Sequence, residues 1–488
     1  MLKSAKPDRF FVTTAIPYMN SHVHLGNCLE YVLADALARA ARLRGEPTYL
    51  LTGTDEHGQK IVTTAKDKGV EVREFVQGNV DFFQAALKEL NVSYDDFIRT
   101  SDQKRHWPVV QAFWRRLKEK GDLYEKDYEG LYCIGCEAFY READLVDGQC
   151  PTHLTKPELT KERNWFFKLS RYSTEILDFL KTRVEPRWRA NEMIKFLEQG
   201  LEDISFSRPK AKLNWGIPVP DDDSQVIYVW CDALVNYLSA VTRVEVNKKT
   251  KAIDLKSDWW PASVHVVGKD IAKFHTLYWP AMLLSAGLAL PEKVLIHGFI
   301  TINGQKISKS LGNVIEPKQI TETYGVDALR FYFLHEVPTV DDGDFSLNHL
   351  KEVYNGVLAD GLGNLVQRLI VMSNKYEVKW SWPTGTNTDL AYRAVLTICS
   401  AGGHFEVQKA LDKLVKQIEE LNRNIQQLAP WELFKTEPDR ARDELIKLLD
   451  ELARLAVTLE PFLPNTSAKI ITQLKTRQPE VLFPKLDQ

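Results

Sequence analysis

The beginning of the chain alternates between strand-like and helix-like segments, and this alternation limits the possible folds more than any other feature of the sequence. Residues 10–16 (FFVTTAI) are apolar and β-branched, which is typical of a buried strand. A helical pattern follows residue 24 and stops near Gly45, and residues 48–51 form a second strand-like run. Strand, helix and strand at this spacing predict a βαβ unit, which implies a parallel sheet.

The α/β alternation stops between about residues 118 and 224 and then resumes, which indicates an insertion into one α/β domain. From about Leu347 onward, apolar residues keep the i, i+3, i+4 spacing of amphipathic helices. We therefore expect an α/β fold with a split Rossmann-type parallel-sheet catalytic domain, an inserted connective domain and a C-terminal α-helical bundle. The expected boundaries are 1–117 for the first Rossmann half, 118–224 for the insertion, 225–346 for the second half and 347–488 for the bundle.

Composition excludes several classes of protein. An apolar fraction of 44% and a charged fraction of 26% are near the averages for globular proteins, so disorder, collagen and coiled coil are not expected. We expect no membrane association and a cytoplasmic location, because no apolar run approaches about 20 residues and no signal peptide is recognisable. The 63 Lys+Arg and 66 Asp+Glu nearly balance, and from Leu347 onward 18 of each cancel. A nucleic-acid partner could therefore not be held by bulk charge.

Three of the six cysteines lie close together and have the spacing of a metal site. Cys133 and Cys136 form one pair, and Cys150 and His153 form a second pair 13 intervening residues later. Three thiolates and one imidazole in two such pairs suit a closed tetrahedral site, so we predict one structural zinc per chain within the insertion. The alternative is a set of unrelated buried thiols.

Two further segments could bind phosphate, since each follows a predicted strand. His24-Leu25-Gly26-Asn27 begins a helix, and helix N-termini at the carboxyl edge of a parallel sheet favour anions. The second segment, residues 303–313 (NGQKISKSLGN), carries two lysines, Lys306 and Lys309, that could neutralise charge during phosphoryl transfer. Taken singly, the first segment could be an ordinary helix cap, and the second could be a solvated surface loop.

Together the two segments resemble the paired HIGH and KMSKS signatures of class I aminoacyl-tRNA synthetases. They occur here as HLGN and KISKS, with Asn27 in place of the second His and Ile307 in place of Met. The stretches TAIPYMNSHVHLGN, LTGTDEHGQK, YVWCDALVNY, VVGKDIAKFHTLYWPAML and KISKSLGNVI are similar to the methionyl-tRNA synthetase family. The resemblance implies catalytic roles for His24, Asn27, Lys306 and Lys309. It implies ATP binding, with Mg²⁺ accompanying the nucleotide, by His24, Gly26, Asn27, Glu30, Gly268, Lys269, Asp270, Lys306, Ser308 and Lys309.

The same resemblance implies the other substrates, L-methionine and tRNA(Met). It places Ile16, Tyr18, Asp55, Trp230, Ala233, Tyr237, Ile271, Phe274 and His275 around methionine, with Asp55 on the ammonium group. It assigns recognition of the CAU anticodon to Asn364, Arg368 and Trp431. Aromatic stacking and side-chain hydrogen bonds suit single-stranded loop bases, although a lone Trp after a Pro could equally belong to a core. We expect a monomer, because no dimerisation module follows the helices.

Three alternatives remain open at this point. The first is a class I synthetase for another amino acid, although an insertion of about 100 residues is too short for the editing domain that discrimination by one methylene requires. The second is a different nucleotidyltransferase, which would not need the helical region. The third is a non-catalytic RNA-binding or zinc-scaffold relative, against which the intact His24 and KISKS lysines speak.

Overall fold

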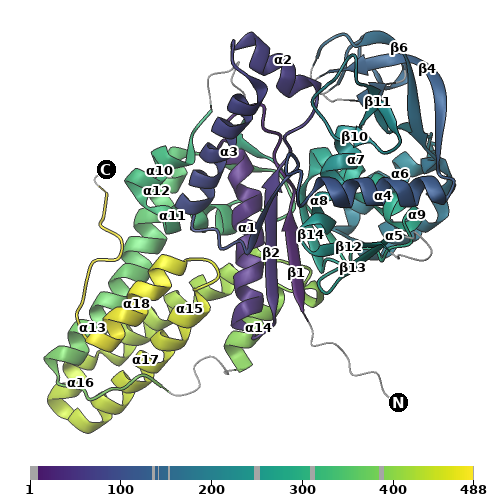
Figure 1. The fold of residues 1–488 in the computed structure, drawn as a ribbon. Helices are drawn as coiled ribbons and strands as arrows, with labels where there is room; N and C mark the ends of the chain where they lie inside the picture. Colours follow the sequence, from purple (N-terminus) through teal and green to yellow (C-terminus); the bar gives the residue numbers. More distant parts are fainter. Residues whose placement is uncertain are drawn as a thin grey trace, which may run out of the picture.

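The computed structural model describes residues 9–134, 138–140, 142–151, 154–246, 253–307, 314–383 and 390–486 (Figure 1). At its centre lies a six-stranded sheet in which neighbouring strands run parallel, as the βαβ pattern predicts. The strand order is β3 (Asp96–Arg99), β2 (Thr48–Thr54), β1 (Phe10–Thr14), β14 (Val264–Gly268), β15 (Val294–His297) and β7 (Val184–Glu185).

Helices cover both faces of this sheet, so its central strands are buried on two sides. On one face, α1 (Leu25–Leu43) packs with α3 (Val72–Glu89) on β1 and β2. On the other face lie α4 (Trp107–Glu119), α5 (Ser173–Arg183) and α9 (Trp279–Ser285) (Figure 1). Burial on both faces explains why β1 and β14 read as continuous apolar or β-branched runs without alternation.

The insertion is built mainly from antiparallel strands. A four-stranded sheet contains β5 (Ala138–Tyr140), β4 (Leu123–Cys133), β6 (Glu158–Phe167) and β8 (Ile204–Ser205). A three-stranded sheet contains β10 (Pro218–Val219), β11 (Asp222–Ile227) and β9 (Ser207–Pro209).

Part of the segment 118–224 belongs to the central sheet instead of the insertion. β7 pairs in parallel with β15, and the flanking helices α5 and α6 (Arg187–Glu198) share the core of α4 and α9. The sequence did not indicate this strand, because two residues are too few to carry a periodic pattern. The interval 118–224 expected for the insertion thus contains one strand of the central sheet.

The C-terminal region is helical, as predicted from Leu347 onward (Figure 1). Two of its helices end just before prolines: α15 (Val407–Leu428) before Pro430 and α17 (Pro438–Thr458) before Pro461. The helices after residue 346 are α12 (Leu347–Val353), a π-helix (Tyr354–Gly363), α13 (Asn364–Lys375), α14 (Leu390–Ile398), α15 (Val407–Leu428), α16 (Pro430–Thr436), α17 (Pro438–Thr458) and α18 (Pro464–Thr476).

A buried arginine fastens the helical region to the sheet domain. Arg330, on α11 (Val326–Phe331), is fully buried and pairs with Asp35 of α1 at 2.7 Å. Its guanidinium also donates to the backbone oxygens of Leu90, Pro461 and Phe462 at 3.0–3.1 Å. Because these oxygens come from both regions, one side chain joins them. Among the described residues, no helix is both long and apolar enough to cross a bilayer.

Candidate active site

The residues predicted to bind ATP and methionine lie near the point of the central sheet at which the strand order changes direction. From β1 the chain proceeds through α1 to β2 on one side, whereas β14 and β15 succeed each other on the other side. In an open parallel sheet, the crevice at the carboxyl ends of two such strands is the usual ligand site. The segment after β1 carries Tyr18 and His24, and the segment after β14 carries Asp270.

The HLGN segment forms the capped N-terminus of α1. The backbone N–H of His24 donates to Oδ1 of Asn27 at 3.0 Å, so the amide at position 27 caps its own helix. Asn27 is exposed, and its amide nitrogen remains a donor for a ligand. The N–H of Leu25 donates to the carbonyl of Ile315 at 3.0 Å, which ties the helix start to the chain just beyond KISKS.

The KISKS motif begins in a β-hairpin that packs against the N-terminus of α1. β16 (Ile300–Ile302) and β17 (Gln305–Lys306) are joined by Asn303 and Gly304, both at positive φ, as a two-residue hairpin turn of this kind requires. Ile307 is buried, and a Cβ added at Gly26 would lie 2.9 Å from its Cδ1. The two motifs are therefore in contact, as their pairing predicted. Ser308 and Lys309 lie outside the described residues, and Lys306 is described by its backbone alone.

Glu30 forms a buried polar pair across the crevice. Its Oε1 accepts the N–H of Ala15 at 2.5 Å, and its Oε2 lies 3.1 Å from Nε2 of His297 at the end of β15. Burial by itself would lower the pKa of His297, but the hydrogen bond and negative charge of Glu30 raise it. His297 was not predicted, although a histidine at the carboxyl end of a buried parallel strand was a usable signal.

The chain after β14 approaches this pair closely. A Cβ at Gly268 would lie 2.7 Å from Oδ1 of Asp270, so a side chain at this position would displace the Asp270 carboxylate. Lys269 pairs with Asp342 at 2.5 Å, and its Nζ lies 4.4 Å from the centroid of the Phe299 ring. Asp342 therefore competes with any phosphate for the Lys269 ammonium group.

Four of the nine predicted methionine residues form one aromatic and imidazole cluster, to which the backbone of Ile271 is joined. The rings of Trp230, on α7 (Val229–Leu234), and Phe274 stack with centroids 3.5 Å apart and planes 3° apart. Phe274 and His275 lie on a π-helix (Phe274–Tyr278), a geometry common at functional sites. Oη of Tyr237, on α8 (Asn236–Ser239), lies 2.7 Å from Nε2 of His275. Nδ1 of His275 lies 3.0 Å from the carbonyl oxygen of Ile271.

These hydrogen bonds fix the state of His275. A carbonyl only accepts, so Nδ1 of His275 carries the proton, and Nε2 accepts from the hydroxyl of Tyr237. Burial lowers the pKa of His275 to about 4, which keeps the ring neutral at pH 7. The cluster is therefore uncharged, as an apolar thioether side chain requires.

The remaining predicted methionine residues lie around this cluster or beside it. Tyr18 and Asp55 face each other in a short parallel pairing beyond β1 and β2, and the N–H of Asp55 donates to the carbonyl of Pro17 at 3.0 Å. Asp55 is 8% exposed, and its backbone lies beside that of Tyr18. Ala233 is buried on α7, and Ile16 is half-buried after β1.

A buried histidine–aspartate network behind these residues was missed by sequence reasoning. Asp232 accepts from Nδ1 of His57 and from Nε2 of His106, both at 2.6 Å. All three side chains are at most 2% exposed. Burial would raise the pKa of Asp232, but the two imidazoles outweigh it and lower the pKa. His57 and Asp232 lie inside the quoted stretches TDEHG and VWCDA, so the residues were visible, whereas their pairing was not.

Only half of the predicted zinc site can be located. Cys133 and Cys150 are both buried, whereas Cys136 and His153 lie outside the described residues. Cys133 ends β4, and the carbonyl of Cys150 accepts from the N–H of Leu154 at 2.8 Å. Within the described ranges, no three His, Cys, Asp or Glu residues converge as a metal site.

The proposed anticodon residues lie on two helices of the bundle. Asn364 begins α13 and is exposed, and Arg368 follows one turn later and is half-buried. Trp431 lies on α16, half-buried against the core of the bundle. Tyr376 and Phe434 stack at 3.9 Å and so place α16 beside the C-terminal end of α13. Helices α13 and α16 thus lie close together, but Asn364, Arg368 and Trp431 are not linked to one another by a described hydrogen bond or ring contact.

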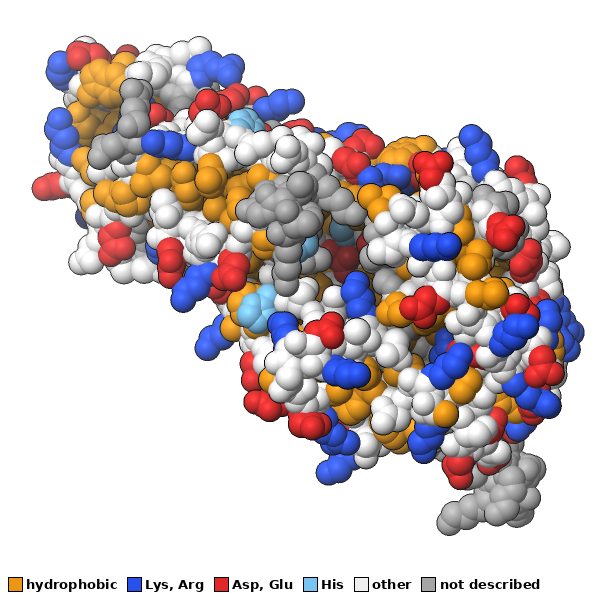
Figure 2. Space-filling view, turned by 90° about the horizontal axis from the view of Figure 1, so that it is seen from above, with side chains coloured by type: hydrophobic (Ala, Val, Ile, Leu, Met, Phe, Trp, Pro, Cys, Tyr) orange, Lys and Arg blue, Asp and Glu red, His pale blue; other side chains and the backbone are white. Residues whose placement is uncertain are grey.

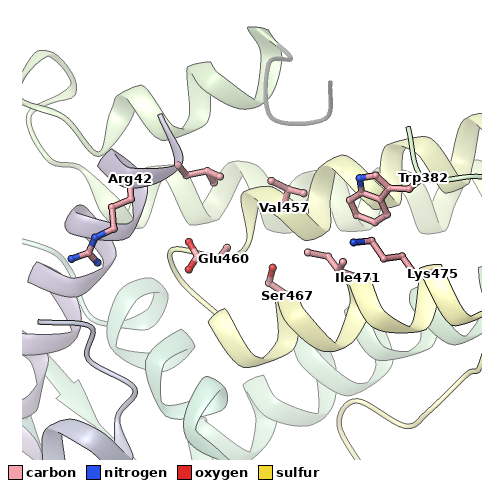
Figure 3. A pocket seen from close by; sticks show the side chains of 8 residues that line it. Arg42, Trp382, Val457, Glu460, Ser467, Ile471 and Lys475 are labelled. Carbon is pink, nitrogen blue, oxygen red and sulfur yellow. The ribbon is translucent and has the colours of Figure 1, made fainter. Parts of the chain in front are cut away.

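Away from this crevice, an open groove of about 520 Å³ lies between α1, α17 and α18 (Figure 3). Lys475 lies 5.0 Å from the ring centroid of Trp382 there, and Arg42 pairs with Asp95 at 2.7 Å. Glu460 pairs with Arg39 at 2.7 Å. Arg42 and Glu460 thus already have partners, and none of the predicted site residues line this groove.

Charge on the molecular surface is mixed. On the face in Figure 2, Lys and Arg side chains alternate with Asp and Glu, and histidines appear near the middle of that face. This distribution agrees with the near-zero balance in the sequence.

Comparison with known proteins identifies the family. The family described as tRNA synthetases class I (M) matches residues 10–156 and 152–370, and the anticodon binding domain of methionyl tRNA ligase matches residues 388–487. The methionine–tRNA ligases of Caldanaerobacter subterraneus and Synechocystis are 39% and 40% identical, covering 98% and 97% of this chain and 79% and 91% of their own.

A solved structure agrees with these relatives. Mycobacterium tuberculosis methionyl-tRNA synthetase in complex with methionyl-adenylate superposes with a TM-score of 0.84 at 34% identity, over 98% of this chain and 99% of that one. The crevice between β1 and β14, the contact between the two signature motifs and these full-length matches lead to one conclusion: the chain belongs to the methionyl-tRNA synthetase family, the class I methionine–tRNA ligases.

Proposed function

We propose that the chain joins L-methionine to tRNA(Met) in two steps at the crevice between β1 and β14. In the first step, a carboxylate oxygen of methionine attacks the α-phosphate of ATP, the bond to the β-phosphate breaks, and methionyl-adenylate and pyrophosphate form. In the second step, the 2′-hydroxyl of the terminal tRNA ribose takes the methionyl group and AMP leaves. The observation that carries the proposal is the contact of Ile307 with Gly26, which puts both signature motifs on one site.

The groups around the N-terminus of α1 would hold ATP with its Mg²⁺. The positive end of the helix dipole and the amide nitrogen of Asn27 suit phosphoryl oxygens, and His24 begins the same turn. Gly26, Glu30, Gly268, Lys269 and Asp270 surround this position from α1 and from the end of β14. Catalysis then depends on positioning and electrostatics, since no covalent enzyme intermediate is required.

The aromatic cluster would hold the methionine side chain. The stacked pair of Trp230 and Phe274 offers the polarisable contact that thioether sulfur favours. The neutral Tyr237–His275 pair adds hydrogen-bonding groups without a charge. Asp55, which is nearly buried, would pair with the substrate ammonium group. Ile16, Tyr18, Ala233 and Ile271 would complete the pocket.

The decisive experiment is methionine-dependent exchange of pyrophosphate into ATP, tested against all twenty amino acids. Exchange with methionine alone is expected. Exchange driven by another amino acid, or no exchange with any amino acid, would contradict the proposal.

Lys306 and Lys309 would stabilise the pentavalent transition state at the α-phosphate. Lys309→Ala is therefore expected to reduce adenylate formation far more than methionine binding measured by equilibrium dialysis. Lys318→Ala, on the exposed surface of α10 (Pro317–Tyr324), is the matched control and should change neither. An equal loss of exchange and of methionine binding in Lys309→Ala would contradict the assigned role.

We also propose one structural zinc bound by Cys133, Cys136, Cys150 and His153. The burial of both described thiols supports the site, since exposed thiols would suit oxidation more than a closed metal centre. Metal analysis of the purified chain should give one zinc per molecule, and Cys150→Ser should lower this content. Cys399→Ser, at a buried thiol in another region, should leave the zinc content unchanged.

Anticodon reading by Asn364, Arg368 and Trp431 is proposed on the family match to the bundle and on the placement of α13 beside α16. The domain limits 1–117, 118–224, 225–346 and 347–488, the monomeric state and the cytoplasmic location are proposals that rest on the sequence. Sedimentation at several concentrations tests the monomer, and a concentration-dependent mass would contradict it.

A further inference from the structure

Two aspartates contact the segments that carry Lys269 and Lys306, two lysines of the proposed ATP site. Both aspartates lie at β18 (Gly343–Phe345), a short strand that pairs in parallel with β16. Asp342 directly precedes this strand, and Asp344 is its middle residue. The other edge of β16 pairs with β17, on which KISKS begins. β18 is therefore joined, through β16, to the hairpin of the KISKS motif.

Asp342 holds the ammonium group of Lys269 with both of its carboxylate oxygens. Nζ of Lys269 lies 2.7 Å from Oδ1 and 2.5 Å from Oδ2. Oδ1 also accepts the backbone N–H of Phe299 at 2.9 Å, so the carboxylate is itself anchored to the chain. An ammonium group has three N–H donors, and a carboxylate that takes two of them leaves one for a phosphate oxygen. Asp342 therefore weakens the charge that Lys269 presents to phosphate, but it also fixes the direction of that charge.

The backbone that carries Asp342 is packed tightly against the chain that follows β15. A Cβ added at Gly298 would collide with the carbonyl oxygen of Asp341 and would lie 2.6 Å from the backbone nitrogen of Asp342. The N–H of Gly343 donates to the carbonyl of Phe299 at 2.9 Å. Since the opposing atoms are backbone atoms, they cannot rotate away as a flexible side chain can. The start of β18 is thus held at a fixed distance from the end of β15.

Asp344 bonds to the hairpin on which Lys306 lies. Its Oδ1 accepts the backbone N–H of Gly304 at 2.7 Å and the hydroxyl of Thr301 at 2.6 Å. Gly304 is the second residue of the two-residue turn, and Thr301 is the residue opposite Lys306 in the pairing of β16 with β17. One carboxylate therefore bonds both to the turn before Lys306 and to the residue opposite it.

A buried tyrosine fastens β18 from its other side. Tyr332 begins a π-helix (Tyr332–Glu336) and is 1% exposed. Its hydroxyl donates to the carbonyl of Asp344 at 3.1 Å and accepts the N–H of Ser346 at 3.3 Å. The strand is thus fixed to the interior as well as to β16, so its two aspartates are presented from a rigid support.

We infer that Asp342 and Asp344 are positioning residues that fix Lys269 and Lys306 relative to each other for adenylate formation. Asp342 acts through the Lys269 ammonium group, and Asp344 acts through the backbone of the hairpin. This role rests on the proposed function, in which Lys269 binds ATP and Lys306 stabilises the transition state. Two cations from separate segments must act on one triphosphate, and a displacement of about 1 Å can cost about 100-fold in rate.

The first test compares Asp342→Asn with Asp341→Asn in pyrophosphate exchange. Both changes remove one exposed carboxylate charge, and the Asp341 carboxylate has no hydrogen bond or ion pair among the described residues. Asp342→Asn is expected to lower kcat about ten- to 100-fold, because the Lys269 ammonium group loses its direction. The KM for ATP should change little, since the weaker orientation is offset by the loss of a competing charge, and the KM for methionine should stay the same. Asp341→Asn should change none of these constants.

The second test uses two substitutions of Asp344. Its partners are a backbone N–H and a hydroxyl, which need an acceptor but not a negative charge. Asp344→Ala removes the acceptor and is expected to lower kcat for exchange, whereas Asp344→Asn keeps an acceptor oxygen and should restore most of it. At position 342 the partner is an ammonium group, so Asn is not expected to suffice there. If Asp344→Ala fails to fold, Asp342→Asn, at an exposed side chain, still decides the question.

A double substitution shows whether Asp342 acts through Lys269. Lys269→Met removes the ammonium group and keeps a side chain of similar length. In that background, Asp342→Asn should cause no further loss of kcat, because the group that it orients is gone. Equal fold-losses from Asp342→Asn with and without Lys269 would show that Asp342 acts by another route and would overturn its assigned role.

Three other results would overturn the inference. A lower KM for ATP with unchanged kcat in Asp342→Asn would identify Asp342 as a competitor of phosphate only. Equal effects of Asp342→Asn and Asp341→Asn would reduce the effect to surface charge. Equal losses of kcat in Asp344→Ala and Asp344→Asn would exclude the hydrogen bonds of Asp344 as the cause. If the unmodified enzyme showed no methionine-dependent exchange, the proposed function itself would fail.

Discussion

The contact between Gly26 and Ile307 gives the sharpest prediction about catalysis. Gly26 is at a non-positive φ near the start of α1, so alanine is compatible with the backbone there. The new methyl group would lie 2.9 Å from Cδ1 of Ile307 and 3.3 Å from the His24 ring. Favourable carbon–carbon contacts lie at about 3.5–4.0 Å, so Ile307 must retreat by about 0.6–1 Å.

The free energy needed to displace Ile307 sets the size of the expected effect on catalysis. Ile307 is 8% exposed and has little room to move, and overpacking a buried site usually costs about 1–3 kcal/mol. Because the methyl end of a long side chain yields more easily than backbone, we expect the lower part of this range, about 1–2 kcal/mol. Displacement of the residue next to Lys306 would then slow pyrophosphate exchange about five- to 30-fold.

The matched variant removes the obstructing atom. Ile307→Val deletes Cδ1, and as a single change it should cost about 0.5–1.5 kcal/mol of stability with little effect on exchange. In Gly26→Ala/Ile307→Val the exchange rate should recover to within a few-fold of Ile307→Val, with the His24 contact as the remaining obstacle. Exchange rates and the double-mutant coupling energy are the measurements. Additive effects of the two substitutions would show that the motifs do not touch, and the proposed site would lose its main support.

Three further results are expected. Arg330→Met leaves Asp35 buried with one fewer partner and should destabilise the fold by about 3–5 kcal/mol, which a lower urea midpoint would show. A change in stability below about 1 kcal/mol would contradict the role of Arg330 as the link between the two regions. Asp232→Asn should lower the free energy of unfolding at pH 7. Because folding lowers the pKa of Asp232, the ionised carboxylate stabilises the fold fully above its unfolded pKa of about 4, and this stabilisation disappears as the pH falls through its folded pKa. The free energies of unfolding of the two proteins should therefore converge in acid. A difference between them that stays constant with pH would refute this. Trp431→Ala should weaken tRNA charging while exchange stays intact, and a parallel loss of exchange would identify Trp431 as a core residue.

Much of the catalytic site could be predicted from local sequence. The βαβ pattern places residues after β1 and β14 at the carboxyl edge of a parallel sheet, and both segments are there. The NG turn before KISKS predicts its own hairpin, because two adjacent positive φ angles suit Asn and Gly. The resemblance named the aromatic residues, and Trp230, Tyr237, Phe274 and His275 do form one cluster.

Long-range packing decided the rest. β7 has only two residues, and it becomes a strand because β15 offers an open edge. Asp232 meets His57 and His106 across separations of 175 and 126 residues, and no local period encodes such pairings. The same holds for Arg330, whose partners come from α1 and from the chain near Pro461. The sequence by itself determined which elements form and which residues could act, since periodicity and turn chemistry are local. Only the tertiary structure decided which of those residues touch, because buried charges and rings take partners that the fold brings near.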